Sequence, residues 1–178
     1  RELNDDYHIE GSPKKDIMLE LKNVSNHHRK HSRHKLENIR LTIHKGEILG
    51  IAGVEGNGQT ELVEAMTGMG GYTSGTIEIG GKDIRGSSVA AIRALKVAHI
   101  PEDRMTMGIA PKLSLTENMI ADKLSWKKFF KNGIINRKAV RSYGEEMVDQ
   151  YQVLCKSQDV SIDSLSGGNI QKVVLARE

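Results

Sequence analysis

The chain has 178 residues, of which 38% are hydrophobic and 28% are charged, and its formal net charge is +3. This length is enough for one domain with a hydrophobic core but too short for two full ones, and the composition excludes a disordered chain. No apolar run approaches the roughly 20 residues that span a bilayer, and the polar opening predicts no signal peptide. The single cysteine, Cys155, excludes an internal disulfide and is typical of a reducing compartment.

The first 16 residues are polar and contain Gly11 and Pro13, so we expect a linker over 1–16. The alternation of apolar and polar residues over 18–24 predicts a half-buried strand, and 36–43 is a second strand candidate.

A basic run from His27 to Lys35 separates these two strands and carries most of the excess charge, and we interpret it as a solvated loop. A nucleic-acid patch would need interleaved aromatic residues or a recognition fold, and neither is present. His28, His31 and His34 suggest a metal site, but four Lys or Arg residues in the same run would repel the cation.

A turn at 44–46 leads into the nearly all-apolar run 47–52, which predicts a strand buried on both faces of a parallel sheet. A glycine-rich loop follows, and residues 60–68 then predict a helix with an apolar face that ends at Gly68.

Two further short strands are predicted at 75–79 and 97–100. The stretch 115–153 is mostly helical in pattern, with Asn136 as the N-cap of a helix that runs to about Tyr151.

The glycine-rich loop has the residues of a phosphate-binding loop: Gly53, Val54, Glu55, Gly56, Asn57, Gly58, Gln59 and Thr60. Glycines allow consecutive backbone N–H groups to turn inward, and the helix N-terminus adds partial positive charge. The consensus G-x-x-x-x-G-K-[ST] is matched except that Gln59 replaces the lysine. This neutral amide lowers the expected phosphate affinity by roughly ten- to a hundredfold, and Glu61 adds an acid nearby. By itself, the loop is also compatible with a plain strand-turn-helix.

A second glycine-rich motif precedes an apparent helix over 172–178 and consists of Leu165, Ser166, Gly167, Gly168 and Asn169. A serine hydroxyl, two glycine N–H groups and a helix N-terminus together form an anion site. A single Ser-Gly-Gly is common in loops, but its combination with an upstream phosphate loop is a much more specific sequence signal.

The two motifs resemble the phosphate loop and the signature motif of ABC ATPases, and the resemblance extends from Met18 to Glu178. Finer features are similar to the second ATP-binding half of tandem importers of sugars or nucleosides. They are the segment 50–62, the segment Ile100-Pro101-Glu102-Asp103-Arg104 and the Asn169 variant of the signature. The opening Arg1-Glu2-Leu3 resembles the linker between the two halves of these importers. The segment 115–121 is similar to the nucleoside branch.

The resemblance implies an α/β fold of the P-loop NTPase class, with an ABC-ATPase core sheet and a helical subdomain, incomplete at the C-terminus. It divides the chain into a linker (1–16), a partial nucleotide-binding core (17–105) and a helical subdomain with the signature (106–178), which receives the permease. The family's aspartate strand, catalytic glutamate and switch histidine would follow Glu178. We therefore assign no catalytic residue and expect the chain alone to be inactive.

The same resemblance implies ATP and Mg²⁺ as cofactors, with Thr60 as a magnesium ligand. Glu102 occupies the place of a glutamine that senses magnesium and the membrane partner. No Phe, Tyr or Trp is present between Ser25 and Lys35 to stack on adenine, so His28 or His31 would have to substitute.

The implied partners are the first ATP-binding half of the same transporter, the membrane permease subunits and, indirectly, a solute-binding protein, at the cytoplasmic face of the cell membrane; nucleic acid is not among them. Because ABC domains pair head to tail, 53–61 would form the weaker ATP site, and 165–169 would serve the ATP held by the other half. Two alternatives stay open: an ABC ATPase outside transport, which usually keeps the lysine, and a regulatory or binding module that never hydrolyses ATP.

Overall fold

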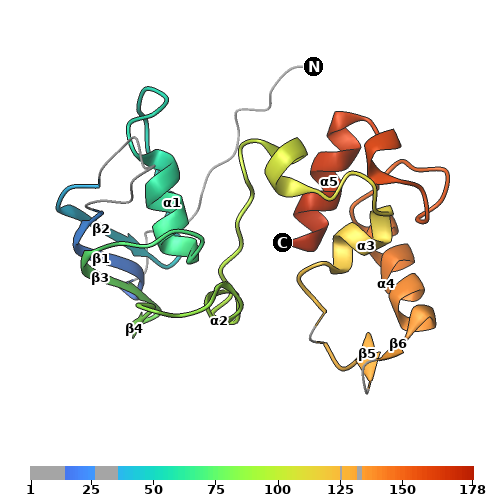
Figure 1. Cartoon of the computed structure of the whole chain (residues 1–178), viewed down its shortest axis with the longest axis horizontal. Helices are drawn as coiled ribbons and strands as arrows, with labels where there is room; N and C mark the ends of the chain where they lie inside the picture. The colour runs from blue at the N-terminus through green and yellow to red at the C-terminus, as the bar shows by residue number, and fades with distance from the viewer. Residues whose placement is uncertain (1–14, 27–35, 125, 132–133) are drawn as a thin grey trace. The chain divides into compact units, whose positions relative to one another are not determined.

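The computed structural model describes residues 15–26, 36–124, 126–131 and 134–178 (Figure 1). The chain divides between Val97 and Ala98 into two compact units, each with a hydrophobic core of its own. Residues 98–105, assigned from sequence to the nucleotide-binding core, lie in the second unit. Most of the predicted linker and the basic run 27–35 fall outside the described residues. Within the described ranges, no helix is both long and apolar enough to span a bilayer.

The first unit contains a four-stranded antiparallel sheet with the strand order β2-β1-β3-β4 (Figure 1). Its strands are β1 (Ile17–Ser25), β2 (Ile39–His44), β3 (Ser74–Ile79) and β4 (Lys82–Asp83). Leu21 of β1 lies opposite Leu41 of β2 and Ile77 of β3, so these three apolar side chains share one face of the sheet. The strands predicted at 18–24, 36–43 and 75–79 are therefore confirmed, although β2 begins at Ile39.

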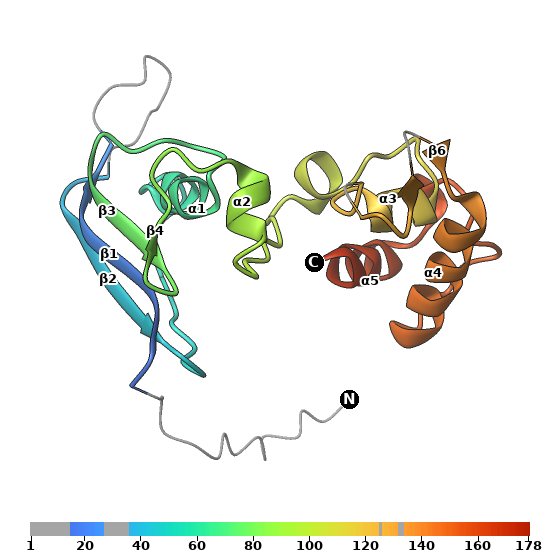
Figure 2. The ribbon, with the colours of Figure 1, turned by 90° about the horizontal axis from the view of Figure 1, so that it is seen from below.

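Two helices, α1 (Gln59–Thr67) and α2 (Val89–Arg93), lie on the same face of this sheet (Figure 2). They complete a buried apolar cluster that includes Leu21, Val24, Leu62, Ala65, Ile77 and Ile92. Gly68 ends α1 in the left-handed conformation with φ 77°, as the sequence predicts. The first unit thus holds the glycine-rich loop at the start of a helix that is anchored by its apolar face.

Two predicted strands are not formed. Residues 47–52 belong to no sheet, and Ile48 and Ile51 are 83% and 52% exposed. Residues 97–100 likewise lie outside every described strand. A strand is stable when its backbone groups bond to a neighbouring strand, and among the described residues no segment pairs with either run. The predicted parallel strand buried on both faces is therefore wrong for the described chain.

The second unit is mainly helical (Figure 1). Its elements are the π-helix η1 (Arg104–Gly108), α3 (Leu115–Ile120), β5 (Phe130–Lys131), β6 (Ile134–Ile135), α4 (Arg137–Gln150), the 3-10 helix η2 (Ile162–Ser164) and α5 (Gly167–Arg177). The Asn136 side chain accepts a hydrogen bond from the Ala139 N–H, which confirms the predicted N-cap of α4. The small hairpin β5-β6 interrupts the stretch 115–153, so that this stretch is helical mainly at its two ends.

The core of the second unit forms where α3 packs against α4 and α5. Its largest fully buried side chains include Phe129, Leu115, Met119, Ile162 and Val173. The single tryptophan, Trp126, stacks on Phe129 with ring centroids 5.6 Å apart, and Tyr143 lies against both rings. This core supports α5, the helix that begins at the second glycine-rich motif.

The C-terminal end of α5 is fixed by three polar contacts. The buried Lys123 ammonium donates to the Arg177 carbonyl oxygen over 2.5 Å. The Arg177 guanidinium donates to the Gly108 carbonyl oxygen over 2.6 Å. The Glu178 carboxylate accepts a hydrogen bond from the His99 N–H over 3.0 Å. With this end held, the N-terminus of α5 is positioned relative to segments distant in sequence.

Candidate functional site

The glycine-rich loop of the first unit contains two glycines in the left-handed region and a tight turn. Gly56 and Gly58 have positive φ angles of 88° and 100°, which side chains other than glycine rarely tolerate. The Asn57 N–H bonds to the Val54 carbonyl oxygen over 3.2 Å, which closes the loop into a tight turn. Gly58 is the N-cap residue of α1 and, because it has no side chain, makes no side-chain capping hydrogen bond. The first N–H groups of α1 are therefore left for an anion.

Gln59 directs its amide back onto the loop. Its Nε2 donates to the Val54 carbonyl oxygen over 3.3 Å. The same amide lies against Gly53 so closely that a Cβ at Gly53 would clash with it. The lysine of the consensus would present a positive charge here, whereas this neutral amide is already hydrogen-bonded within the loop.

The remaining residues assigned to this loop are accessible. Val54, Glu55 and Thr60 are exposed, and Glu61 is half-buried in the first turn of α1. The role of Thr60 as a magnesium ligand stays a prediction, and the described residues contain no cluster of three or more metal-ligating side chains. Glu102 is exposed and belongs to the second unit, so its relation to the loop also stays a prediction. His28, His31 and His34 lie outside the described residues.

The second motif forms the N-terminus of α5. Ser166 is the N-cap residue, and Ser166, Gly167 and Gly168 are all exposed. Leu165 is half-buried against the core, which anchors the motif. A Cβ at Gly168 would meet no atom within 4 Å, so open space surrounds this glycine. An exposed helix N-terminus with flanking glycines can receive an anion closely.

Asn169, the last residue of the motif, makes hydrogen bonds through both the oxygen and the nitrogen of its amide. Its Nδ2 donates to the Ser166 hydroxyl oxygen over 3.0 Å. Its Oδ1 accepts a hydrogen bond from the Leu154 N–H over 2.9 Å. The motif is therefore tied to the loop that leaves α4.

Arg104 lies beside this motif and was given no role from sequence. One of its terminal nitrogens lies 3.6 Å from the position that a Cβ on Gly167 would occupy. Its Nε is buried and has no hydrogen-bond partner within the described part of the chain. The adjacent Asp103 caps η1, and hydrogen bonds from the Thr106 hydroxyl and backbone lower the pKa of Asp103 below its usual value. No sequence signal places this cation at the signature, because the two are separated by more than sixty residues.

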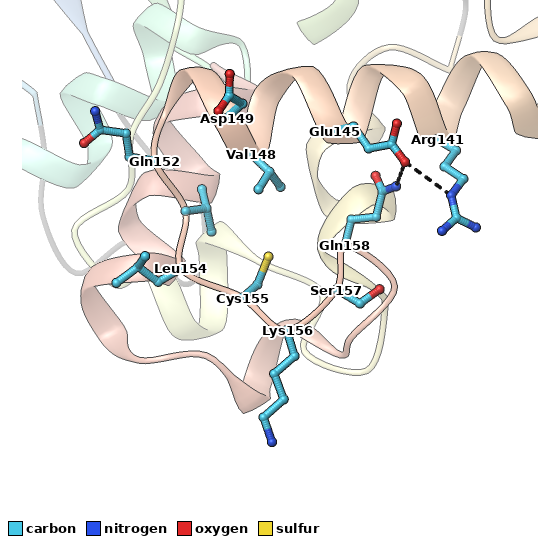
Figure 3. Close-up of a pocket in the computed structure, with 11 residues that line it drawn as sticks. Arg141, Glu145, Val148, Asp149, Gln152, Leu154, Cys155, Lys156, Ser157 and Gln158 are labelled. Atoms are coloured by element: carbon cyan, nitrogen blue, oxygen red, sulfur yellow. Dashed lines mark hydrogen bonds and ion pairs between the residues drawn. The ribbon is translucent and has the colours of Figure 1, made fainter.

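Two cavities flank the loop that follows α4, and both are lined by 153–156. One, of about 550 Å³, is bordered by the signature residues Leu165, Ser166 and Asn169. The other, of about 610 Å³, lies beside α4 (Figure 3). There the Glu145 carboxylate accepts a hydrogen bond from Gln158 and pairs with Arg141. Sequence reasoning identified neither cavity, because each is formed by segments that only the fold brings together.

Comparison with known proteins identifies the family. The family model described as ABC transporter matches residues 36–178. The chain is 36% identical over 164 residues to the nucleoside import ATP-binding protein NupA of Lactococcus lactis subsp. cremoris, covering 92% of this chain and 32% of that protein. It is 32% identical over 178 residues to the ribose import ATP-binding protein RbsA of Bacillus cereus, covering 99% of this chain and 34% of that protein. The chain thus spans about a third of the length of these curated relatives.

Solved structures show the same fold. The dimeric bacterial ABC transporter cassette MJ0796 matches with a TM-score of 0.66 and 20% identity, covering 90% of this chain and 68% of that one. Its post-hydrolysis form, bound to ADP and Pi, matches with a TM-score of 0.67. The chain has the ABC-ATPase cassette fold of the P-loop NTPase class, and it belongs to the ABC transporter family.

Proposed function

We propose that this chain is the ATP-binding domain of an importer and provides the energy for uptake of a sugar or a nucleoside. The observation that carries the proposal is the signature motif, which lies exposed at the N-terminus of a well-anchored α5. The curated relatives include import proteins for a nucleoside, guanosine, glucose and ribose, which supports this substrate range.

Each ATP, in this proposal, binds between the phosphate loop of one domain and the signature of another. Ser166, Gly167 and Gly168 would contact the ATP held by the partner ATP-binding half, while the loop around Gln59 would form the weaker site. The tandem arrangement, with this chain in the second half, is part of the same proposal. It rests on the segments 50–62 and 100–104 that resemble those importers.

Mg²⁺ would accompany ATP, and it supplies charge neutralisation at the terminal phosphates when bound. Thr60 offers an exposed hydroxyl for it at the start of α1. Glu102 would occupy the place of the residue that senses magnesium. Oxygen ligands of this kind suit a hard cation.

The proposed partners are the first ATP-binding half, the membrane permease subunits and a solute-binding protein, which would place the chain at the cytoplasmic face of the membrane. The helical second unit would receive the permease. A regulatory module is a second candidate, and the internally bonded Gln59 favours it because nucleotide must compete with the Val54 contact.

Uptake by the assembled transporter tests the proposal. The protein that contains this chain is reconstituted in vesicles with its membrane subunits, and labelled ribose, glucose and guanosine are supplied with the solute-binding protein. We expect ATP-dependent accumulation of one of these solutes and its loss with Ser166→Arg. ATP hydrolysis without uptake of any sugar or nucleoside would contradict the importer function, and binding without hydrolysis would favour the regulatory module.

A further inference from the structure

The Asn169 amide links the signature to the loop that leaves α4. Leu154, which donates its backbone N–H to Asn169, is itself 75% exposed and lies beside the cavity next to α4 (Figure 3). The loop is held a second time, because the Lys172 ammonium donates to the Gln152 carbonyl oxygen over 2.7 Å. Two polar side chains from the first turns of α5 thus fix this loop, so that the amide of Asn169 lies between fixed neighbours.

The orientation of this amide follows from the chemistry of its partners. A backbone N–H can only donate, so the atom of Asn169 that faces Leu154 must be the carbonyl oxygen. The amide NH₂ then faces Ser166 and must donate to its hydroxyl oxygen, 3.0 Å away. The arrangement allows no second assignment of the amide.

The polarity of the Ser166 hydroxyl is set as a result. A hydroxyl has one hydrogen and two lone pairs, and one lone pair is taken by Asn169. Although Ser166 is the N-cap of α5, its side chain accepts no bond from the helix backbone. In the described ranges no protein acceptor takes its hydrogen. The hydrogen is therefore available to an anion in front of the helix.

We propose that Asn169 is a positioning residue that keeps the Ser166 hydroxyl as a donor toward the terminal phosphate of the ATP held by the partner domain. This inference rests on the proposed function of the signature. Asn169 acts through Ser166 and does not itself contact the nucleotide. A hydrogen bond to a charged acceptor changes an equilibrium or rate by about ten- to a hundredfold. Loss of the hydroxyl as a donor should therefore slow ATP hydrolysis by a comparable factor.

Asn169→Asp tests the proposal in the assembled transporter. The substitution keeps the shape and the acceptor for the Leu154 N–H but presents an oxygen to Ser166. The hydroxyl must then donate to that carboxylate and is lost to the phosphate. We expect single-turnover ATP hydrolysis to fall about tenfold or more when Ser166 is present. In a Ser166→Ala background, the same change should cost less than about twofold, because no hydroxyl remains to reorient.

Gln171→Glu is the matched control for charge, since Gln171 is exposed in the first turns of the same helix. It should leave hydrolysis within about twofold of the unaltered protein. Equal losses from Asn169→Asp with and without the Ser166 hydroxyl would overturn this inference alone. Hydrolysis and uptake that are unaffected by Ser166→Ala and by Ser166→Arg would instead overturn the proposed role of the signature itself.

Discussion

The side chain of Gln59 donates a hydrogen bond to the backbone carbonyl oxygen of Val54, 3.3 Å away, inside the loop that would hold phosphate. The position of the consensus lysine is thus taken by a neutral group that bonds to its own loop. The Gln59 amide must leave this contact before it can bond to a phosphate, and it then brings no positive charge.

Gln59→Lys is expected to tighten ATP binding by roughly one order of magnitude, because a hydrogen bond from a charged donor contributes about 1.5–3 kcal/mol. Calorimetric titration of the purified chain with ATP measures this change in affinity. Gln59→Met, which has similar length and no charge, is the control and should give no gain. Tight binding by the unaltered chain, or no gain from lysine, would contradict the prediction.

The signature and the loop should contribute unequally to turnover in the assembled transporter. We expect Ser166→Arg or Gly168→Asp to abolish most steady-state ATP hydrolysis and Gln59→Ala to change it little. A side chain at Gly168 meets open space, so the loss would come from charge facing phosphate rather than from a steric clash. Gly168→Ala, which adds a methyl group but no charge, is the control and should lose less activity than Gly168→Asp. If Gln59→Ala is as damaging as the signature changes, the two sites are not divided in this way.

The start of α3 should be sensitive to pH. Ser114 and Glu117 form a capping box in which each side chain bonds to the other residue's backbone N–H. Ser114→Ala should lower the free energy of unfolding by about 1 kcal/mol. Hydrogen bonds from the Ser114 N–H and hydroxyl hold the pKa of Glu117 below its ordinary value of 4.5. Its contribution is therefore present above that value and is lost as pH falls through the lowered pKa.

Urea unfolding of the unaltered chain and of Glu117→Gln at about pH 7 and about pH 3 checks the sign. The stability difference between the two proteins should be larger at the higher pH. A difference that grows on acidification would show that the carboxylate does not act as the cap.

Gly144 in α4 should not tolerate a side chain. A Cβ at this position would clash with the Gln158 amide oxygen and the Thr116 hydroxyl, which are themselves hydrogen-bonded to each other. Gly144→Ala should lower the free energy of unfolding by about 1–3 kcal/mol through overpacking. Fluorescence of the single Trp126, which lies in the same unit beside Tyr143, follows the transition. Gly168→Ala, which meets open space, should be neutral or stabilising, and equal effects of the two changes would refute the packing argument.

The exposed apolar run around 47–54 should cause self-association. Ile48 and Val54 are 83% and 76% exposed, and 47–52 has no strand partner in the described structure. Unpaired backbone with apolar side chains favours pairing with another chain. Sedimentation velocity should show concentration-dependent association that Ile48→Lys with Ile51→Lys reduces. Leu154→Lys, an equally polar change at another exposed site, should have little effect. A purified chain that stays monomeric throughout would contradict this prediction.

Local signals in the sequence determined several elements of this protein. The end of α1 and the start of α4 follow from Gly68 and Asn136, because helix caps depend on one or two residues and their own backbone. Both glycine-rich motifs were recognisable for the same reason, since anion binding at a helix N-terminus uses consecutive residues. The run 47–52 was misassigned because apolar composition indicates a tendency to be buried but does not identify a neighbouring strand.

Only the tertiary structure decided which contacts the residues of the two motifs make. It brought the Arg104 guanidinium to Gly167 and the Leu154 N–H to Asn169, and it folded Gln59 back onto Val54. Such contacts depend on which rotamers the packing permits and on which distant segments meet. A hydrogen bond also requires direction as well as proximity. The sequence therefore determined that two glycine-rich loops lead into helices, whereas the packing of α5 against the loop after α4 decided how the side chains of the second loop are hydrogen-bonded.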